Sequence, residues 1–372
     1  MKILIADQFS ELGGAQRTLL ELLPALQHHG WPCLLALPGE GPFRTRAQAL
    51  GVECREITCG PFGCGTKSVS DVMKFSTQFT KLRSQFRHLI DDFRPDIFYV
   101  NAPRLVPAAC SLGNSTPPIV FHTHNYLKQR YAAALTGRFL RHAGASVIGN
   151  CNFVLEPLRP YLTRSNVEVI FNGVPDYSFR TPRPRIARIG ILGRICPEKG
   201  QKVFVQAARE FSNLNFVICG GTQFDDSNAE PYFNEVRDLA AGLPIEFTGW
   251  RDDVSDVLHT LDLLVVASMP FAEATTRVIP EAWSAGVPVL ASDLPGIREI
   301  LTDSQTGFLF PPGDAQALAS RIKELVNAPE KLATVTINGR RHYEENFQID
   351  GFQRRIIANL EKSRASAISK EV

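Results

Sequence analysis

Short apolar runs alternate with longer segments of helical periodicity along the whole chain. In the first half, six apolar runs fit buried strands: 3–6, 33–37, 97–100, 119–121, 146–148 and 167–171. Six more follow in the second half: 189–192, 215–219, 245–248, 263–267, 287–291 and 307–310. Strands that alternate with helices are typical of an α/β fold with parallel sheets. We therefore predict two doubly wound domains, each with its own sheet.

The break between the two series of strands lies in a proline-rich, basic segment at residues 179–185. A length of 372 residues is also typical of two domains. We therefore predict an N-terminal Rossmann-like domain over residues 1–180 and a second one over residues 181–350. The remaining residues, 351–372, are predicted to form a C-terminal helix, with packing against the N-terminal domain as one option.

Composition narrows the class of protein. No apolar run reaches the roughly 18 residues of a transmembrane helix, and the start, Met1 to Asp7, fits a buried strand better than a signal peptide. The eight cysteines lack metal or redox spacing, and several lie in apolar segments, as reduced core thiols do. We expect a cytoplasmic protein without a nucleic-acid partner, located on the inner face of the membrane if it associates with one.

The formal net charge of +2 is unevenly divided. Residues 1–180 carry 19 Lys and Arg against 13 Asp and Glu, and the remainder carries 21 against 25. Two interpretations stay open: compositional scatter, or a basic surface that faces an anionic partner or membrane. Likewise, the Phe-rich stripe over residues 72–93 fits either a helix packed on a sheet or an amphipathic helix on a membrane interface.

Two of the predicted strands end in loops suited to phosphate. Gly13 and Gly14 follow the first strand and open a helix, so backbone N–H groups can approach a phosphate without a Cβ in the way. In the second half, the loop Gly193-Arg-Ile-Cys-Pro-Glu-Lys-Gly200 holds two cations. Arg194 and Lys199 on one loop can clamp a diphosphate, although both are also ordinary surface cations.

Two glutamates separated by seven residues form the most informative segment. Glu273 falls in the loop after the strand at 263–267, and Glu281 falls in the early turns of a short helix that Gly286 ends. Ligands of doubly wound sheets bind at this edge, and a helix N-terminus favours phosphate. A carboxylate just inside that helix can accept hydrogen bonds from two sugar hydroxyls. The alternative is a solvated loop acid followed by a capping acid.

One strand of the first half ends in His122-Thr-His124. Residues two apart share a face of a strand, and histidine can donate or accept a hydrogen bond near neutral pH. Such a pair can also bind zinc, but nothing nearby completes a ligand set. The acid pairs at 225–226 and 252–253 fit solvated loops. We therefore predict no metal and no cofactor.

The second half carries the most specific motifs. They are Gly193 to Gly200, Phe247-Thr-Gly249, the segment from Glu273 to Glu299 with Glu281-Ala-Trp-Ser-Ala-Gly286 inside it, and Thr306-Gly-Phe-Leu-Phe-Pro-Pro-Gly-Asp314. Together with Asn172-Gly-Val174 before them, they resemble the retaining glycosyltransferases of family 4, the glycosyl transferases group 1. The resemblance covers essentially the whole chain. It implies the GT-B fold, in which two Rossmann-like domains face a cleft.

The resemblance assigns roles to residues. Donor-binding roles fall to Gly13, Gly14, Arg194, Lys199, Thr275, Thr276, Arg277 and Glu281. Among them, Arg194 and Lys199 would neutralise the diphosphate and Glu281 would bind the ribose. Catalytic roles fall to Glu273, at the reacting face of the donor sugar, and to a first-domain histidine. His124 matches that histidine best because it precedes Asn125 and ends the strand, and His122 is the fallback.

The implied activity is transfer of a sugar from a UDP- or GDP-sugar to a hydroxyl of a glycan or lipid-linked acceptor. Retention of configuration, independence from metal, and a setting in cell-surface polysaccharide or glycolipid synthesis are also implied. Thr275-Thr276 stands where the family commonly has Phe-Gly, so we expect an unusual donor preference. The alternatives are a nucleotide-sugar epimerase or hydrolase on the same fold, or a non-catalytic subunit that binds a sugar nucleotide.

Overall fold

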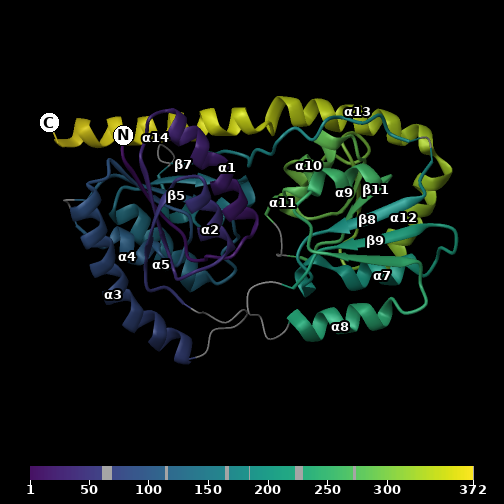
Figure 1. Cartoon of the computed structure of the whole chain (residues 1–372), viewed down its shortest axis with the longest axis horizontal. Helices are drawn as coiled ribbons and strands as arrows, with labels where there is room; N and C mark the ends of the chain where they lie inside the picture. The colour runs from purple at the N-terminus through teal and green to yellow at the C-terminus, as the bar shows by residue number, and fades with distance from the viewer. Residues whose placement is uncertain are drawn as a thin grey trace. The chain divides into compact units, whose positions relative to one another are not determined.

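In the computed structural model, the chain forms two compact units, each around its own parallel sheet (Figure 1). The structure describes residues 1–60, 69–113, 116–163, 167–183, 185–222, 229–270 and 274–371, without the side chains of 69–76, 229 and 369–371. The first unit comprises Met1–Asn172 and Asp350–Val372, and the second comprises Gly173–Ile349. The chain therefore enters the second unit after Asn172, ahead of the proline-rich segment.

The first unit is built on a seven-stranded parallel sheet in the order β3-β2-β1-β4-β5-β6-β7. Its strands are β1 (Ile3–Ala6), β2 (Cys33–Leu37), β3 (Glu53–Glu56), β4 (Ile97–Val100), β5 (Ile119–Thr123), β6 (Ser146–Gly149) and β7 (Val167–Val169). The strands β1, β2, β4 and β5 are buried along their whole length, which is why they are apolar runs in the sequence. The edge strand β3 was not predicted because its residues, Glu-Cys-Arg-Glu, are mostly exposed and polar.

Helices on both sides of this sheet complete the first unit. They are α1 (Gly14–His28), α2 (Pro42–Ala49), α3 (Val69–Phe93), α4 (Val106–Cys110), α5 (Arg130–His142), α6 (Asn152–Leu155), the 3-10 helix η1 (Arg159–Tyr161) and the C-terminal α14 (Ile349–Glu371). Side chains fasten α14 to this unit. Asn359 donates from Nδ2 to Oε2 of Glu168 at 2.9 Å, and Arg364 pairs with Asp96 at 2.8 Å. The last helix of the chain thus belongs to the first unit.

The Phe-rich stripe lies on α3, and its described part is packed. Leu82, Phe86 and Leu89 are buried. The ring of Phe86 meets the ring of Phe98 on β4 edge to face, with the centroids 5.0 Å apart. These side chains face the sheet of the unit, so this part of α3 is a packed helix and not a membrane-facing one.

The second unit has a six-stranded parallel sheet in the order β10-β9-β8-β11-β12-β13. Its strands are β8 (Arg188–Leu192), β9 (Asn215–Cys219), β10 (Ile245–Gly249), β11 (Leu263–Val266), β12 (Val289–Ser292) and β13 (Phe308–Phe310). Its helices are η3 (Pro197–Lys199), α7 (Gln201–Ala208), α8 (Ala229–Leu239), α9 (Val254–Thr260), α10 (Val278–Ala285), α11 (Pro295–Arg298), α12 (Ala315–Asn327) and α13 (Pro329–Asn346). In Figure 1, α7 and α8 lie on one side of the sheet and α9 and α10 on the other.

Both units therefore have the doubly wound arrangement that the alternating pattern predicts, and the α/β fold class is confirmed. In such sheets, ligands bind beyond the carboxyl ends of the strands, at the point where the strand order reverses. The order reverses between β1 and β4 in the first unit and between β8 and β11 in the second. Among the described residues, no helix is long and apolar enough to cross a membrane.

Candidate functional site

In the second unit, the loops that follow β8 and β11 pack directly against each other. The backbone N–H of Met269 donates to the carbonyl of Glu198 at 2.9 Å. Gly200 has a φ of +71°, and a Cβ at this position would lie 1.9 Å from the carbonyl oxygen of Ala267. Glycine at 200 therefore satisfies both a left-handed backbone and a close contact, and it fixes the path of the cationic loop at the switch point.

A second close contact joins the ends of β8 and β9. A Cβ on Gly220 would lie 1.8 Å from the carbonyl oxygen of Gly193. The N–H of Gly193 donates to Cys219, and the N–H of Gly220 donates to Gly249, each at 2.9 Å. Backbone contacts thus join the three strand-end loops closely and fix their paths at this edge of the sheet.

The two predicted phosphate-binding cations lie on this fixed loop. Gln201 is buried and donates from Nε2 to the carbonyl of Arg194 at 2.9 Å, which anchors the backbone beneath the guanidinium. Lys199 ends the 3-10 helix η3. Both cationic side chains are half-buried. They are therefore close enough in sequence and open enough to solvent to neutralise a diphosphate.

Glu281 lies in the first turn of α10, which Gly286 ends in a left-handed conformation, as the sequence predicts. Its carboxylate is buried and lies 3.4 Å from Nη2 of Arg277. Arg277 also donates from Nη1 to the carbonyl of Gly173 at 3.1 Å. The structure thus brings two of the predicted donor-binding residues together as an ion pair at the start of one helix.

The loop before α10 carries the remaining second-unit candidates. Thr276 is buried and Thr275 is half-buried. Ala274 packs on α11, where a Cβ on Gly296 would lie 1.9 Å from its carbonyl oxygen. Glu273, the predicted catalytic carboxylate, lies outside the described residues, and so do the acids at 225–226.

In the first unit, three strands place polar side chains on one face of the sheet at its carboxyl edge. The register pairs Ala6 with Val100, and Val100 with Phe121, so Asp7 and Asn101 continue β1 and β4 beside β5. Asp7 is fully buried and accepts a hydrogen bond from Nδ2 of Asn101 at 2.6 Å. The amide oxygen of Asn101 lies 2.9 Å from Nε2 of His124. The strand order therefore connects a buried carboxylate to the predicted histidine through one amide.

The predicted glycine loop joins the same carboxylate. Gly13 is the N-cap of α1, and its N–H donates to Oε1 of Gln16 at 3.1 Å. Gln16 in turn donates from Nε2 to both carboxylate oxygens of Asp7, each at 3.0 Å. Burial raises the pKa of Asp7 to about 6, although the hydrogen bond from Asn101 opposes this shift. The start of α1 is thus fixed by the residue that also anchors Asn101.

His122, the fallback candidate, is more deeply placed than His124. Its ring is buried and stacks at a tilt on His124, with the centroids 3.9 Å apart. Its Nδ1 lies 2.5 Å from the hydroxyl of Tyr99. Burial, and then the charge of His124, hold the pKa of His122 well below its usual range. A neutral, buried His122 supports the ring of His124.

Sequence reasoning missed Asp7, Gln16 and Asn101. A signal was present for two of them, because Asp7 and Asn101 each directly follow a predicted buried strand. Asn150 follows β6 in the same way, and its buried Oδ1 has no hydrogen-bond partner among the described residues. Gln16 gave no such signal, since a glutamine in a first helical turn is common on protein surfaces.

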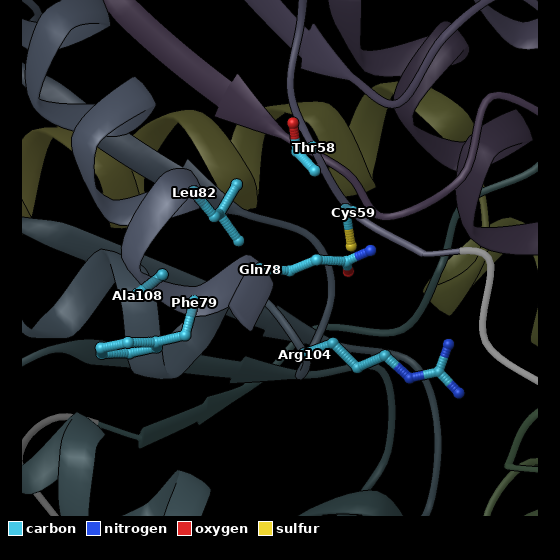
Figure 2. Close-up of a pocket in the computed structure, with 7 residues that line it drawn as sticks. All are labelled: Thr58, Cys59, Gln78, Phe79, Leu82, Arg104 and Ala108. Carbon is cyan, nitrogen blue, oxygen red and sulfur yellow. The ribbon is translucent and has the colours of Figure 1, made fainter. Parts of the chain in front are cut away.

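A small hollow in the first unit lies between the exit of β3, α3 and α4 (Figure 2). It is lined by Thr58, Cys59, Gln78, Phe79, Leu82, Arg104 and Ala108. Its volume of about 10 Å³ is near the minimum for one water molecule. Gln78 holds the backbone of Gly60 through two hydrogen bonds, and burial raises the pKa of the Cys59 thiol to about 12. The hollow is therefore a packing defect beside an unreactive thiol, not a sugar site.

Among the described residues, no group of three or more His, Cys, Asp or Glu side chains is arranged to hold a metal ion. The acid pair at 252–253 includes Asp253, which forms an ion pair with Arg251.

Comparison with known proteins identifies the family. Residues 13–173 match the family described as Glycosyl transferase 4-like domain, and residues 186–328 match the family described as Glycosyl transferases group 1. Sulfoquinovosyl transferase SQD2 of Arabidopsis thaliana is 27% identical over 291 residues, which cover 69% of this chain and 54% of SQD2. The lipopolysaccharide core biosynthesis glycosyltransferase LpsE of Rhizobium meliloti is 26% identical over 36% of this chain and 38% of LpsE. The matched part thus spans about half of SQD2 and less than half of LpsE.

Solved structures agree on the fold. HepE of Anabaena, crystallised in complex with UDP-glucose, superposes with a TM-score of 0.82 at 21% identity, over 97% of this chain and all of HepE. Sucrose-phosphate synthase of Thermosynechococcus elongatus superposes with a TM-score of 0.80 at 17% identity, over 98% of this chain and all of that chain. The two family matches together cover most of the sequence, and both units have the predicted doubly wound sheets. The chain therefore belongs to the family-4 glycosyltransferases, the glycosyl transferases group 1, with the GT-B fold.

Proposed function

We propose that this protein is a retaining glycosyltransferase that moves a sugar from a nucleotide-sugar donor to an acceptor hydroxyl. The observation that carries the proposal is the edge of the second unit. There, Arg194 and Lys199 stand on a rigid glycine-rich loop at the switch point of the sheet. Glu281 lies at the start of a helix that follows the next strand of that edge. The crystal complexes of HepE with UDP and with UDP-glucose support a UDP-sugar as the donor.

Each second-unit group has a distinct task in this proposal. Arg194 and Lys199 neutralise the diphosphate as it departs, and the N-terminus of α10 adds the positive end of its dipole. Glu281 accepts hydrogen bonds from the two ribose hydroxyls, while Arg277 holds its carboxylate in place. Thr276 offers a hydroxyl where the family commonly has glycine. Glu273 is assigned to the donor sugar. Because cations of the chain neutralise the diphosphate, we propose that no metal is required.

The first unit supplies the acceptor side. His124 hydrogen-bonds the acceptor or the donor sugar near the reacting carbon. Gly14 offers its backbone N–H to the diphosphate, and Gly13, whose own N–H donates to Gln16, lets the diphosphate approach without a Cβ in the way. Catalysis then rests on proximity and electrostatics, with no protein nucleophile. A departing diphosphate oxygen takes the proton of the acceptor hydroxyl, so the new glycosidic bond forms on the face that the diphosphate leaves. That outcome is retention of configuration.

We also propose that the acceptor is presented at an anionic membrane surface, as a glycolipid or a lipid-linked glycan. The support comes from α5 and the residue before its N-cap. Exposed cations there are Lys128, Arg130, Arg138 and Arg141, beside the exposed side chains of Tyr131 and Leu135. From residue 97 to residue 155 the sequence contains no Asp or Glu. A cationic helix surface with exposed apolar groups fits a membrane of anionic lipids.

A ligand screen tests the donor assignment. Thermal unfolding is measured with UDP, GDP, ADP and the corresponding sugar nucleotides, because a ligand that binds only the folded state raises stability. We expect the strongest stabilisation from UDP or a UDP-sugar. The preferred donor is then incubated with candidate acceptors, with and without EDTA, and the anomeric configuration of the product is determined by NMR.

Five outcomes would contradict parts of the proposal. No stabilisation by any nucleotide would remove the donor site. Release of free sugar or nucleotide without an acceptor would favour the epimerase or hydrolase alternative, and binding without turnover would favour a non-catalytic subunit. Complete loss of turnover in EDTA, restored by Mg²⁺ or Mn²⁺, would show that the diphosphate is neutralised by a metal. An inverted linkage would exclude the retaining mechanism.

Sedimentation with vesicles tests the membrane assignment. We expect vesicles of anionic lipid to retain the protein at low salt and to release it as salt screens the charges. The variant Arg130→Glu/Arg138→Glu/Arg141→Glu should stay in the supernatant. A matched control reverses three exposed cations of the second unit, Arg237, Lys323 and Arg341, and should still bind. Equal recovery of wild type with neutral and anionic vesicles would favour a soluble acceptor.

A further inference from the structure

The carboxylate of Asp7 is surrounded by hydrogen-bond donors that come from three parts of the first unit. Its Oδ1 accepts from the backbone N–H of Phe9 at 3.0 Å, and Nε2 of Gln16 donates to both oxygens. Its Oδ2 accepts from Nδ2 of Asn101 at 2.6 Å. Phe9, Gln16 and Asn101 all donate to this side chain, so position 7 requires a group that only accepts hydrogen bonds. An ionised carboxylate meets that requirement.

The arrangement around Asp7 determines how the Asn101 amide is oriented. If Asn101 were rotated by half a turn, its oxygen would face a carboxylate oxygen at hydrogen-bond distance, with no hydrogen between them. The observed orientation avoids this repulsion and sends the amide oxygen toward His124, where Nε2 lies at 2.9 Å. An amide oxygen can only accept, so the hydrogen of this contact must be on Nε2 of His124.

From this geometry we propose that Asp7 and Asn101 are a positioning pair that fixes the tautomer of His124. The pair places the ring hydrogen on Nε2 and leaves the lone pair on Nδ1. His124 then presents Nδ1 as a hydrogen-bond acceptor, which suits a hydroxyl group of a sugar or acceptor rather than a carbonyl or phosphate oxygen. Only this last consequence rests on the proposed glycosyltransferase function.

The variant Asp7→Asn should reverse the tautomer. The amide oxygen of the new side chain is needed at the Oδ1 position, because the fixed backbone N–H of Phe9 donates only there, whereas Gln16 donates to both positions. Its NH₂ group then occupies the Oδ2 position and faces Asn101. Asn101 must turn its oxygen toward that donor, so its own NH₂ group turns toward His124. Nε2 of His124 must then accept, and the ring hydrogen moves to Nδ1.

The tautomer is measured directly by the ¹⁵N chemical shifts of the imidazole nitrogens in ¹⁵N-labelled full-length protein without substrate. The measurement is made at pH 8, where Asp7, with a pKa raised by burial to about 6, is ionised. The signals of His124 are assigned by their absence from His124→Gln. We expect a protonated Nε2 in wild type and a protonated Nδ1 in Asp7→Asn. A folded Asp7→Asn protein with the wild-type tautomer would overturn the proposal, as would a protonated Nδ1 in wild type.

Three further variants keep the test decisive if Asp7→Asn does not fold. Asn101→Leu removes the acceptor of the Nε2 hydrogen, so this hydrogen should exchange with solvent much faster and the ring shifts should move. In Asn101→Asp the new carboxyl and Asp7 must share a proton between their facing oxygens. The other oxygen of the new carboxyl still accepts from His124, so Nε2 should stay protonated. Gln16→Met is the control. Gln16 donates to Asp7 and has no hydrogen bond to His124, so its replacement should leave the tautomer of His124 unchanged. Unchanged ring shifts and exchange in Asn101→Leu would contradict the proposal.

Activity provides a separate measurement. If wild type transfers sugar, Asn101→Leu and Asp7→Asn should lower kcat by about tenfold, the loss expected when one hydrogen bond near the reacting carbon is not made, with the donor KM nearly unchanged. Wild-type kcat in a variant whose tautomer has changed would show that the Nδ1 lone pair is not used. If wild type transfers no sugar, the proposed function fails while the tautomer measurement still decides the role of Asp7 and Asn101.

Discussion

The two units present carboxyl edges of the same topological kind but of different construction. At the edge of the second unit, glycine backbones approach one another so closely that a Cβ on Gly200 or Gly220 would lie within 2 Å of a carbonyl oxygen. Charged side chains then project from this rigid backbone. At the edge of the first unit, buried side chains make the contacts, and Asp7, Asn101 and His124 hold one another through hydrogen bonds.

The difference corresponds to two chemical tasks. A diphosphate is large and strongly charged, so it needs room at the backbone and cations that can move to meet it. A single hydroxyl near a reacting carbon needs one acceptor atom at a fixed place, which requires a side chain that cannot rotate. We therefore expect substitutions in the second unit to act on donor binding, and substitutions in the first unit to act on the rate of transfer.

The largest effect is expected from Gly200→Ala. Its methyl group would overlap the carbonyl of Ala267 and occupy a left-handed backbone, and the combined cost is about 4 kcal/mol in the free energy of unfolding. Gly242→Ala is the matched control, since Gly242 has a φ of +77° but no atom within 4 Å of a Cβ. It should cost about 1 kcal/mol. Urea unfolding of both variants measures the difference, and equal losses would show that the close contact is unimportant.

The second-largest effect is the pH dependence that Asp7 gives to the free energy of unfolding. Its pKa is raised from 3.8 in the unfolded chain to about 6 in the folded protein, so the folded state binds the proton more tightly. Stability from this group is therefore greatest below pH 4 and is lost as the pH rises to 6. The loss amounts to about 3 kcal/mol at about 1.4 kcal/mol per pKa unit.

Urea unfolding of wild type and Asp7→Asn across pH 4.5 to 7.5 measures this loss, because other titrating groups cancel in the comparison. We expect the stability of wild type relative to the variant to fall as the pH rises through this range. A constant difference between the two proteins would show that the carboxyl is not strongly desolvated.

Removal of either cation of the second unit should weaken nucleotide binding. Arg194→Ala and Lys199→Ala each delete a charge-assisted contact, for which the typical loss is about 1.5–3 kcal/mol. Calorimetric titration with the preferred nucleoside diphosphate measures this loss. Arg237→Ala, an exposed cation on α8, serves as the control and should bind normally. Wild-type affinity in both test variants would remove this loop from the donor site.

The smallest effect is the one that most directly separates the two edges. Glu281→Gln should raise the donor KM about tenfold, since a charged hydrogen-bond acceptor becomes neutral, with little change in kcat. His124→Ala should lower kcat and leave the donor KM nearly unchanged. His122→Ala should lower kcat less, because His122 only supports the ring of His124. Steady-state kinetics separates these patterns. A larger loss from His122→Ala would transfer the histidine role to His122.

The second-unit edge could be predicted in some detail from the sequence. Its loop from Gly193 to Gly200 and its helix with Glu281 are contiguous segments whose glycines, cations and acids follow directly after apolar strands. The pairing of Glu281 with Arg277 could also be expected, since residues four apart on a helix are neighbours. The first-unit edge was predicted only as far as His124 and the glycines of α1, because its other members are single polar residues at the ends of separate strands.

The sequence by itself determined the elements and their class. Burial on both faces makes the inner strands continuous apolar runs, and that signal is local. The edge strand β3 and the attachment of α14 to the first unit were decided by the tertiary structure, because neither depends on a local pattern. The same is true of the hydrogen bond between Asp7 and Asn101, which are 94 residues apart. The order of strands in the sheet makes those two residues neighbours, and a buried carboxylate that must satisfy its hydrogen bonds then determines what each neighbour does.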